Sequence, residues 1–318
     1  MSPRFMKYLL ANCLSLALAG TPAPVLASPT ESAEASPATI EATRQFDFVS
    51  TINGEAYRVQ TAVPTTQPPP NGYPAIYVLD GSVLFGSFAG AARNRWQAHE
   101  IEPAVIIGID GLRGTDRTLD FTAHDLTPRE KRLIKDLGDN PKFGGYDRFF
   151  RVIQEEVRPR VAQMAPLDGK RAALFGWSLG GLFVVHTMFA HPDAFSTYLA
   201  LSPSLWRTER SVFGEIPDFE RHVSRDNLPV RLFLAVGGRE QDVTKNPLTS
   251  VSDKDWAAEA AYGRMVGNVV DLHAALSQFF ASRQANLAMT VFKGDTHNSV
   301  PWTALNPMLD FALPPTAP

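Results

Sequence analysis

Six short, continuous runs of apolar residues are the feature that most constrains the fold of this chain. They are rich in branched side chains, which is typical of strands buried on both faces of a sheet. The runs occupy residues 75–80, 104–110, 171–176, 198–202, 230–237 and 287–292. Segments with helical character lie between them, at 83–97, 145–163, 180–190, 263–282 and 302–312. This alternation predicts an α/β fold, in which a mostly parallel sheet carries helices on both faces.

An antiparallel hairpin is expected ahead of the parallel strands. Residues 46–52 and 55–63 flank Asn53-Gly54, and this dipeptide is the strongest short signal for a hairpin turn. Residues 111–144 are too long and too charged for a plain connector. Two interpretations stay open for this segment: a solvated surface excursion, or a loop that forms one wall of a substrate site.

The first 27 residues have the features of an export signal. Arg4 and Lys7 give a positive start, and the apolar stretch that follows is too short for a comfortable membrane span. Residues 28–43 contain almost no large apolar side chains and are expected to form a flexible leader. Residues 44–318 are then expected to form a single domain. The sequence predicts a periplasmic protein, or secondly a secreted one, with no stable membrane insertion after signal removal.

Charge and cysteine content exclude several kinds of protein. Lys and Arg number 30 and Asp and Glu number 33, so no basic excess exists to attract nucleic acid. Cys13, inside the expected signal, is the only cysteine, which leaves the mature chain without disulfides or a cysteine nucleophile. No metal-binding or phosphate-binding motif is present, and no cofactor is expected. The sequence does not specify the oligomeric state.

One serine lies at a junction between a predicted strand and a predicted helix. The pentapeptide Gly176-Trp177-Ser178-Leu179-Gly180 fits the pattern G-x-S-x-G. In a nucleophile elbow of this type, the serine occupies a strained turn and glycines allow the strand and the helix to crowd together. The following helix also directs its first amides toward charge that develops at the serine. Ser178 is therefore the candidate nucleophile.

A serine nucleophile needs a base, and the base needs an acid to orient it. In this type of sheet the chain order is serine, acid, histidine. His297 follows the last predicted strand, in a loop that opens into the final helix, which is where the base of such a site belongs. Glu240 and Asp242 both follow the strand at 230–237 and stay open as the orienting acid.

The oxyanion that forms during acyl transfer needs two backbone N–H donors. One is expected from Leu179, the residue after the nucleophile. The other is expected from Gly81 or Ser82, in the loop after the strand at 75–80. Asp80, in the same loop, either braces the turn or faces the substrate.

Five stretches of the chain together resemble a known family. They are "YPAIYVLDGSVLF", "GGYDRFFRVIQEEVRPRV", "GWSLGGLFVVHTMFAHPDAFSTYLALSPSLWR", "LFLAVGGREQD" and "GDTHNSVPWTALNPMLDFAL", and they run from about Tyr73 to Leu313. As a set they are far more specific than the pentapeptide alone. The chain resembles the bacterial "putative esterase" family of α/β-hydrolases, which includes enterobactin esterases and related siderophore trilactone hydrolases.

This resemblance implies an α/β-hydrolase fold and a serine esterase that works through an acyl-enzyme. It assigns the nucleophile to Ser178 and the base to His297, and it favours Glu240 as the acid. It implies a small ester substrate, of which a ferric siderophore with an enterobactin-like trilactone is the sharper expectation. A general carboxylesterase for small esters and an acyltransferase on the same scaffold remain alternatives.

The resemblance also suggests residues that contact the substrate. The family commonly has histidine before the nucleophile, and Trp177 in this position is expected to reshape the pocket floor. The remaining candidates come from the segment "SPSLW" and from arginines that could meet an anionic or catecholate substrate. They are Ser202, Ser204, Trp206, Arg113, Arg117 and Arg207.

Overall fold

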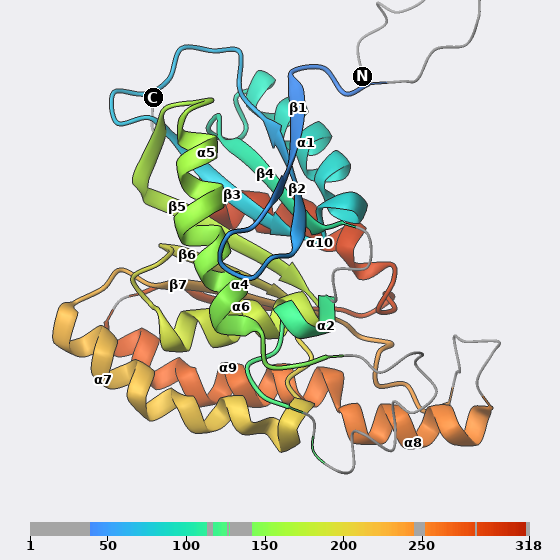
Figure 1. Ribbon diagram of the computed structural model, residues 1–318. Helices are drawn as coiled ribbons and strands as arrows, with labels where there is room; N and C mark the ends of the chain where they lie inside the picture. The colour runs from blue at the N-terminus through green and yellow to red at the C-terminus, as the bar shows by residue number, and fades with distance from the viewer. Residues whose placement is uncertain are drawn as a thin grey trace, which may run out of the picture. The chain divides into compact units, whose positions relative to one another are not determined.

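Eight strands in the described part of the chain form one sheet, in the order β1-β2-β4-β3-β5-β6-β7-β8 (Figure 1). The computed structural model describes residues 39–112, 117–125, 127, 142–244, 252–283 and 285–315. Strands β3 to β8 all pair in parallel, whereas β2 pairs antiparallel with both β1 and β4. The sheet is therefore mostly parallel with an antiparallel hairpin at its N-terminal edge, as predicted.

The predicted strands are all present, with ends that shift by a few residues. The strands are β1 (Thr43–Val49), β2 (Ala56–Ala62), β3 (Tyr73–Leu79), β4 (Val105–Gly111), β5 (Leu167–Trp177), β6 (Thr197–Leu201), β7 (Arg231–Gly237) and β8 (Leu287–Phe292). Strand β1 begins at the last residue of the expected leader. Residues 39–42, also part of the expected leader, are described, whereas residues 1–38 lie outside the described residues.

Helices occupy the segments between the strands. They are α1 (Gly81–Gln97), α2 (Arg117–Asp120), α4 (Tyr146–Arg151), the π-helix η1 (Val152–Val157), α5 (Arg158–Ala162), α6 (Leu179–Ala190), the 3-10 segment η2 (Arg207–Glu215), α7 (Ile216–Asp226), α8 (Asp253–Gly263), α9 (Met265–Ser282) and α10 (Val300–Ala312). None of the helices in the described residues has the length and hydropathy of a membrane span.

The sheet has a hydrophobic core on each face. On one face, the side chains of α1 and α10 pack together with alternate residues of the central strands, as Phe85, Phe88 and Met308 illustrate. On the other face, α4, α6, α7 and α9 cover the sheet, with Phe149, Phe183 and other large side chains between them. All seven residues of β3 are buried, which explains why the central strands appear in the sequence as continuous apolar runs.

Three helical regions were not predicted from the sequence: the short helix α2, the segment η2 with α7, and α8. Segment η2 continues into α7, and α8 precedes α9. Polar and charged residues predominate in α7, and its two buried residues are Phe219 and Val223. Their spacing of four residues was the available signal, but two apolar positions within a strongly charged segment do not mark a helix clearly.

Parallel strands bring their carboxyl ends to the same edge of the sheet. Asp80 follows β3, Ser178 follows β5 and Glu240 follows β7. The loop after β8 contains His297 and leads directly into α10. This topology gathers the candidate residues at one edge, where α/β folds place their ligand sites.

Candidate active site

Ser178 occupies the sharp turn between β5 and α6. Its backbone has φ 62° and ψ −118°, an unfavourable conformation for a residue with a side chain. Such a conformation costs about 1–3 kcal/mol and persists only where tertiary contacts enforce it. The Ser178 N–H donates to the carbonyl of Leu201, and its own carbonyl accepts from the amides of Leu182 and Ser204. These contacts hold the turn in the geometry of a nucleophile elbow.

Two glycines beside Ser178 have no room for a side chain. A Cβ at Gly176 would lie 2.1 Å from the carbonyl oxygen of Gly180. A Cβ at Gly181 would lie 2.8 Å from the carbonyl oxygen of Leu201. The first glycine of G-x-S-x-G is therefore a packing requirement, because strand β5 and helix α6 approach each other backbone to backbone there. Gly181, just after the pattern, is required by the approach of α6 to β6, whereas a Cβ at Gly180 would meet its nearest neighbour at 3.4 Å, an ordinary contact.

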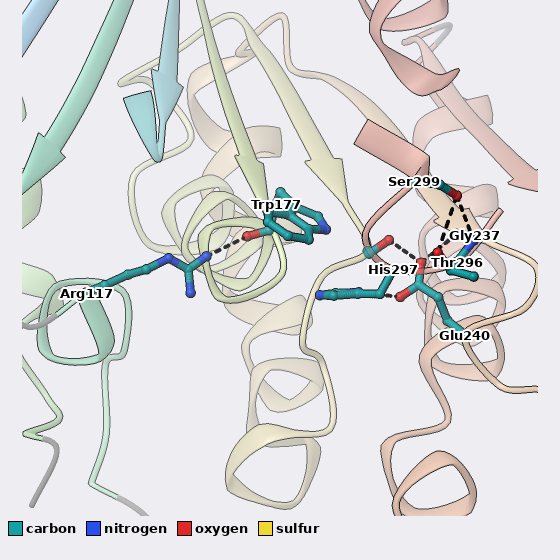
Figure 2. Close-up of polar contacts among 8 residues, drawn as sticks. Arg117, Trp177, Gly237, Glu240, Thr296, His297 and Ser299 are labelled. Carbon is teal, nitrogen blue, oxygen red and sulfur yellow. Dashed lines mark hydrogen bonds and ion pairs between the residues drawn. The ribbon is translucent and has the colours of Figure 1, made fainter. Parts of the chain in front are cut away.

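His297 contacts Glu240 on the side of its Nδ1 atom. The distance from His297 Nδ1 to Glu240 Oε2 is 2.6 Å, and Figure 2 shows the imidazole ring between Trp177 and Glu240. A carboxylate can only accept, so the Nδ1–H of the imidazole donates this bond and Nε2 is left as the acceptor. Of the two acids that the sequence left open, Glu240 is the one in contact with His297, whereas Asp242 Oδ1 accepts from the backbone and hydroxyl of Thr244.

The carboxylate of Glu240 is buried and fixed by two further donors. Its side chain is only 1% exposed, while that of His297 is 37% exposed. Oε1 accepts from the Ser202 hydroxyl at 2.5 Å and from the Gly237 N–H at 2.7 Å. A buried carboxylate needs such partners to offset its lost hydration. Glu240 therefore presents Oε2 to His297 in one defined orientation.

The loop that carries His297 is braced by its neighbours. Ser299 Oγ accepts from the Thr296 N–H at 3.0 Å and donates to Asp295 Oδ1 at 2.6 Å. Thr303, in the first turn of α10, also donates to Asp295 Oδ1. Asp295 thus supports the backbone of the loop, and the orientation of the imidazole comes from Glu240.

Trp177 forms one wall beside the imidazole. Its indole ring lies 4.9 Å from the ring of His297, centroid to centroid, at an interplanar angle of 35°. The indole packs against the core of the α1 and α10 face. Trp177 therefore limits the positions that the His297 ring can adopt, in addition to any contact with substrate.

The structure distinguishes between the two expected oxyanion donors after β3. The Ser82 N–H donates to Asp110 Oδ2 at 2.9 Å, so this amide is already engaged. Gly81 is the first residue of α1, and its backbone packs against β4. Leu179 is the first residue of α6. The first amides of a helix have no intrahelical acceptor, which leaves Gly81 and Leu179 as the candidate pair.

Asp80 braces the turn after β3 through an ion pair with Arg117. Arg117 Nε and Nη2 donate to the two carboxylate oxygens at 2.5 and 2.8 Å, and Nη2 also donates to the Trp177 carbonyl at 3.1 Å. This places Arg117, from the long segment 111–144, at the edge of the site (Figure 2). Arg113, in the same segment, lies outside the described residues.

The other expected substrate contacts occupy different environments. Ser202 and Ser204 are buried; the Ser202 hydroxyl donates to Glu240, and the Ser204 N–H donates to the Ser178 carbonyl. Trp206 is half-buried and packs edge-on against Tyr262. Arg207 is buried and lines a small hollow beside α6, together with Phe121, Leu182 and His186. The two serines therefore support the machinery, whereas the contacts of Trp206 and Arg207 lie with Tyr262 and with the hollow beside α6.

Sequence patterns missed the supporting contacts of this site. Ser202 and Asp110 bind groups that lie 38 and 28 residues away in the chain, and no local spacing in the sequence indicates such bonds. The Gly237 amide binds Glu240 three residues away, in the turn after β7. The positive φ of Ser202, 41°, is equally invisible in the sequence. Among these supporting residues, only Ser202 had a signal in the sequence, because it lies in the segment "SPSLW" that the family resemblance singled out.

Comparison with known proteins places this architecture in a family. The sequence model described as "Putative esterase" matches residues 50–278. The ferri-bacillibactin esterase BesA of Bacillus subtilis is 31% identical over 287 residues, which cover 88% of this chain and 92% of the relative. The siderophore triacetylfusarinine C esterase of Aspergillus fumigatus is 31% identical over 273 residues, covering 80% and 87%.

Solved structures agree with the sequence comparison. The BES protein of Bacillus cereus superposes with a TM-score of 0.74 at 28% identity, and the match covers 88% of this chain and 99% of that protein. The predicted α/β-hydrolase fold is confirmed by this likeness and by the strand order. The chain belongs to the "putative esterase" family of α/β-hydrolases.

Proposed function

We propose that this protein is a serine esterase whose substrate is the ester of a siderophore. The observation that carries the proposal is the elbow at Ser178, with the buried Glu240 carboxylate fixed against His297 at the same sheet edge. Relatives that match most of the chain are named as esterases of ferri-bacillibactin and of triacetylfusarinine C. Together these observations favour siderophore esters over other esters as the substrate class.

The proposed reaction begins with attack of the Ser178 hydroxyl on an ester carbonyl. His297 accepts the hydroxyl proton at Nε2, and Glu240 stabilises the imidazolium through the Nδ1–H bond. The amides of Leu179 and Gly81 stabilise the oxyanion of the tetrahedral intermediate. His297 then gives its proton to the leaving alcohol. Water, activated by the same imidazole, releases the acid from the acyl-enzyme and restores Ser178.

A substrate panel with an active-site control tests this function. Purified protein is assayed against p-nitrophenyl butyrate and against iron-free and ferric enterobactin, with Ser178→Ala as the matched variant. We expect hydrolysis of the trilactone by the wild type, and a loss on the order of 10⁴-fold or more in the variant. Equal turnover by Ser178→Ala would refute the mechanism, and a rate confined to the small ester would make the protein a general carboxylesterase.

A labelling experiment identifies the nucleophile independently of the substrate. A fluorophosphonate forms a covalent bond only with an activated serine. We expect mass spectrometry to find the label on Ser178 in the folded wild type, and no label in Ser178→Ala or in heat-denatured protein. A label on any other serine would overturn the assignment of Ser178.

We also propose that the protein acts after export, in the periplasm. The support is the sequence pattern of residues 1–27, with its positive start and short apolar stretch. Sequencing the N-terminus of the protein recovered from a periplasmic extract tests this directly. A mature protein that begins at Ser28 is expected, and an intact Met1 in the cytoplasmic fraction would contradict it.

A further inference from the structure

We propose that Arg117 is a positioning residue that joins the two loops of the oxyanion hole and neutralises the Asp80 carboxylate beside it. The inference rests on the proposed function, because it concerns the stabilisation of the same oxyanion. It gives Arg117 a role different from the substrate contact that the sequence suggested.

One guanidinium group contacts both loops that supply the candidate donors. Its Nε and Nη2 atoms bind the carboxylate of Asp80 in a bidentate pair, at 2.5 and 2.8 Å. Its Nη2 atom also donates to the carbonyl of Trp177 at 3.1 Å (Figure 2). Asp80 directly precedes Gly81, and Trp177 lies two residues before Leu179. Arg117 therefore fixes the chain just before each candidate amide.

Both loops need such a restraint, because each contains a residue in an unfavourable conformation. Asp80 has φ 56° and ψ 46°, and Ser178 has φ 62°. Left-handed backbone at residues other than glycine is held by the surroundings rather than by local preference. Asp80 occupies the N-cap position of α1, yet its side chain makes no cap bond there. Its carboxylate is turned to Arg117 instead, although aspartate at this position commonly caps the helix.

The position of the Asp80 carboxylate makes its charge important for catalysis. Asp80 is only 7% exposed. A Cβ built on Gly180 would lie 3.4 Å from Asp80 Oδ2, so the carboxylate lies at the first turn of α6. The oxyanion of the reaction forms at the same helix terminus. An unpaired carboxylate so close would oppose the developing negative charge, since two like charges repel strongly in a partly dehydrated site.

Arg117 cancels this charge and is itself held in place. Its guanidinium carbon lies 5.0 Å from the centroid of the Phe121 ring, a distance at which the cation and the ring attract each other. Arginine suits this role because its planar fork matches a carboxylate and still offers a further donor. The side chain is 39% exposed, so a direct substrate contact is the competing explanation that the experiment must separate.

The test is a charge-rescue cycle on a neutral substrate. The variants Arg117→Met, Asp80→Asn and the double variant are compared with the wild type on p-nitrophenyl butyrate, which has no charge for Arg117 to bind. We expect Arg117→Met to lower kcat by about 10²-fold with little change in KM, as the loss of an oxyanion-hole donor does. In the double variant the neutral amide no longer opposes the oxyanion, so we expect kcat to recover by about tenfold or more.

Two further variants keep the result interpretable. Arg225 forms the same bidentate pair with Asp226 at the end of α7, which leads into the amino end of β7, the sheet edge opposite the site. Arg225→Met should therefore leave kcat unchanged. Arg117→Lys keeps the charge and loses the fork, and we expect it to retain more activity than Arg117→Met. Circular dichroism shows whether Arg117→Met folds. If it does not, the charge effect is still tested by comparing the kcat of the double variant and of Arg117→Lys with that of Asp80→Asn.

Three outcomes would overturn the proposal. They are a wild-type kcat in Arg117→Met, a double variant no more active than Arg117→Met, and a defect confined to KM for enterobactin. The last outcome would mean that Arg117 acts by contacting the substrate. Failure of the proposed function is separate, because it shows in the wild type, as absence of ester turnover and of fluorophosphonate labelling at Ser178, before any Arg117 variant is compared.

Discussion

Two histidine–glutamate contacts of equal length occur among the residues that the structure describes, and they lie in different surroundings. His297 Nδ1 and Glu240 Oε2 are 2.6 Å apart, and so are His186 Nδ1 and Glu215 Oε2. The first pair lies on loops at the carboxyl edge of the sheet. The second pair joins helix α6, two turns beyond Ser178, to the end of η2. The ring of Tyr146 lies nearly perpendicular to the His186 imidazole, with the ring centroids 4.3 Å apart.

The difference between the pairs lies in what holds the carboxylate. Glu240 is 1% exposed and has two further donors, whereas the side chain of Glu215 is 25% exposed. His297 is also the more exposed of the two imidazoles, at 37% against 16%. A histidine–carboxylate contact is therefore not enough to identify a base. The base needs a fixed acid on one nitrogen and open access at the other.

The largest expected effect separates the two histidines. His297→Gln removes the proposed base, and we expect kcat for ester hydrolysis to fall by about 10⁴–10⁶-fold. His186→Gln should change kcat less than about threefold, which corresponds to under ~0.7 kcal/mol of barrier. Steady-state rates on p-nitrophenyl butyrate measure both. Comparable losses in the two variants would mean that the pairs are not functionally distinct.

The next effect separates the two acids. Glu240→Gln keeps the size of the side chain but lets an amide donate to Nδ1, which favours the wrong tautomer of His297. We expect a loss of about 10³–10⁴-fold in kcat with little change in KM. Glu215→Gln is the matched control and should keep wild-type kcat. If Glu240→Gln were fully active, the enzyme would work as a serine–histidine pair without an acid.

A smaller effect tests the donors that hold Glu240. Ser202→Ala removes the 2.5 Å bond to Oε1 and leaves the Gly237 amide in place. A hydrogen bond to a charged group contributes about 1.5–3 kcal/mol, so we expect kcat to fall by about 10–100-fold. Ser211→Ala, in the hollow beside the second pair, serves as the control. Thermal melts must show that both variants remain folded at the assay temperature.

The aromatic neighbours of the two imidazoles give a still smaller contrast. Trp177→Ala removes the wall beside His297, and we expect a loss of roughly tenfold in kcat, as for a displaced catalytic group. Trp177→Phe keeps a ring there and should lose less. Tyr146→Phe, next to His186, should lower stability by about 1 kcal/mol through its bond to Thr187, without affecting kcat. An unaltered kcat in Trp177→Ala would limit Trp177 to substrate contact.

The smallest expected effect is a pH dependence of stability near the second pair. Burial lowers the pKa of His191, whose ring stacks on Phe150 at 4.2 Å. As the pH falls below the unfolded pKa of about 6.5, the unfolded state binds a proton before the folded state does, and stability decreases. We expect the unfolding midpoint of the wild type to fall more than that of His191→Gln between pH 7.5 and 5.5. Parallel curves would contradict this.

Much of the fold followed from local sequence patterns. The strands could be recognised in the sequence as apolar runs, because both faces of a central parallel strand are buried, as in β3. Segments η2 and α7 could not, because their apolar residues are few within a charged stretch. The elbow at Ser178 was predictable for a different local reason: Gly176 and Gly181 are required by close backbone contacts between neighbouring elements.

The sequence by itself determined the strand–helix alternation, the serine in its elbow and the late loop with His297, because short-range backbone and packing rules act on neighbouring residues. The tertiary structure decided which acid contacts that histidine and which arginine pairs with Asp80. Glu240 and His297 are 57 residues apart, and Arg117 and Asp80 are 37 apart. Such partners are chosen by where the sheet edge brings the loops together, which depends on the whole fold.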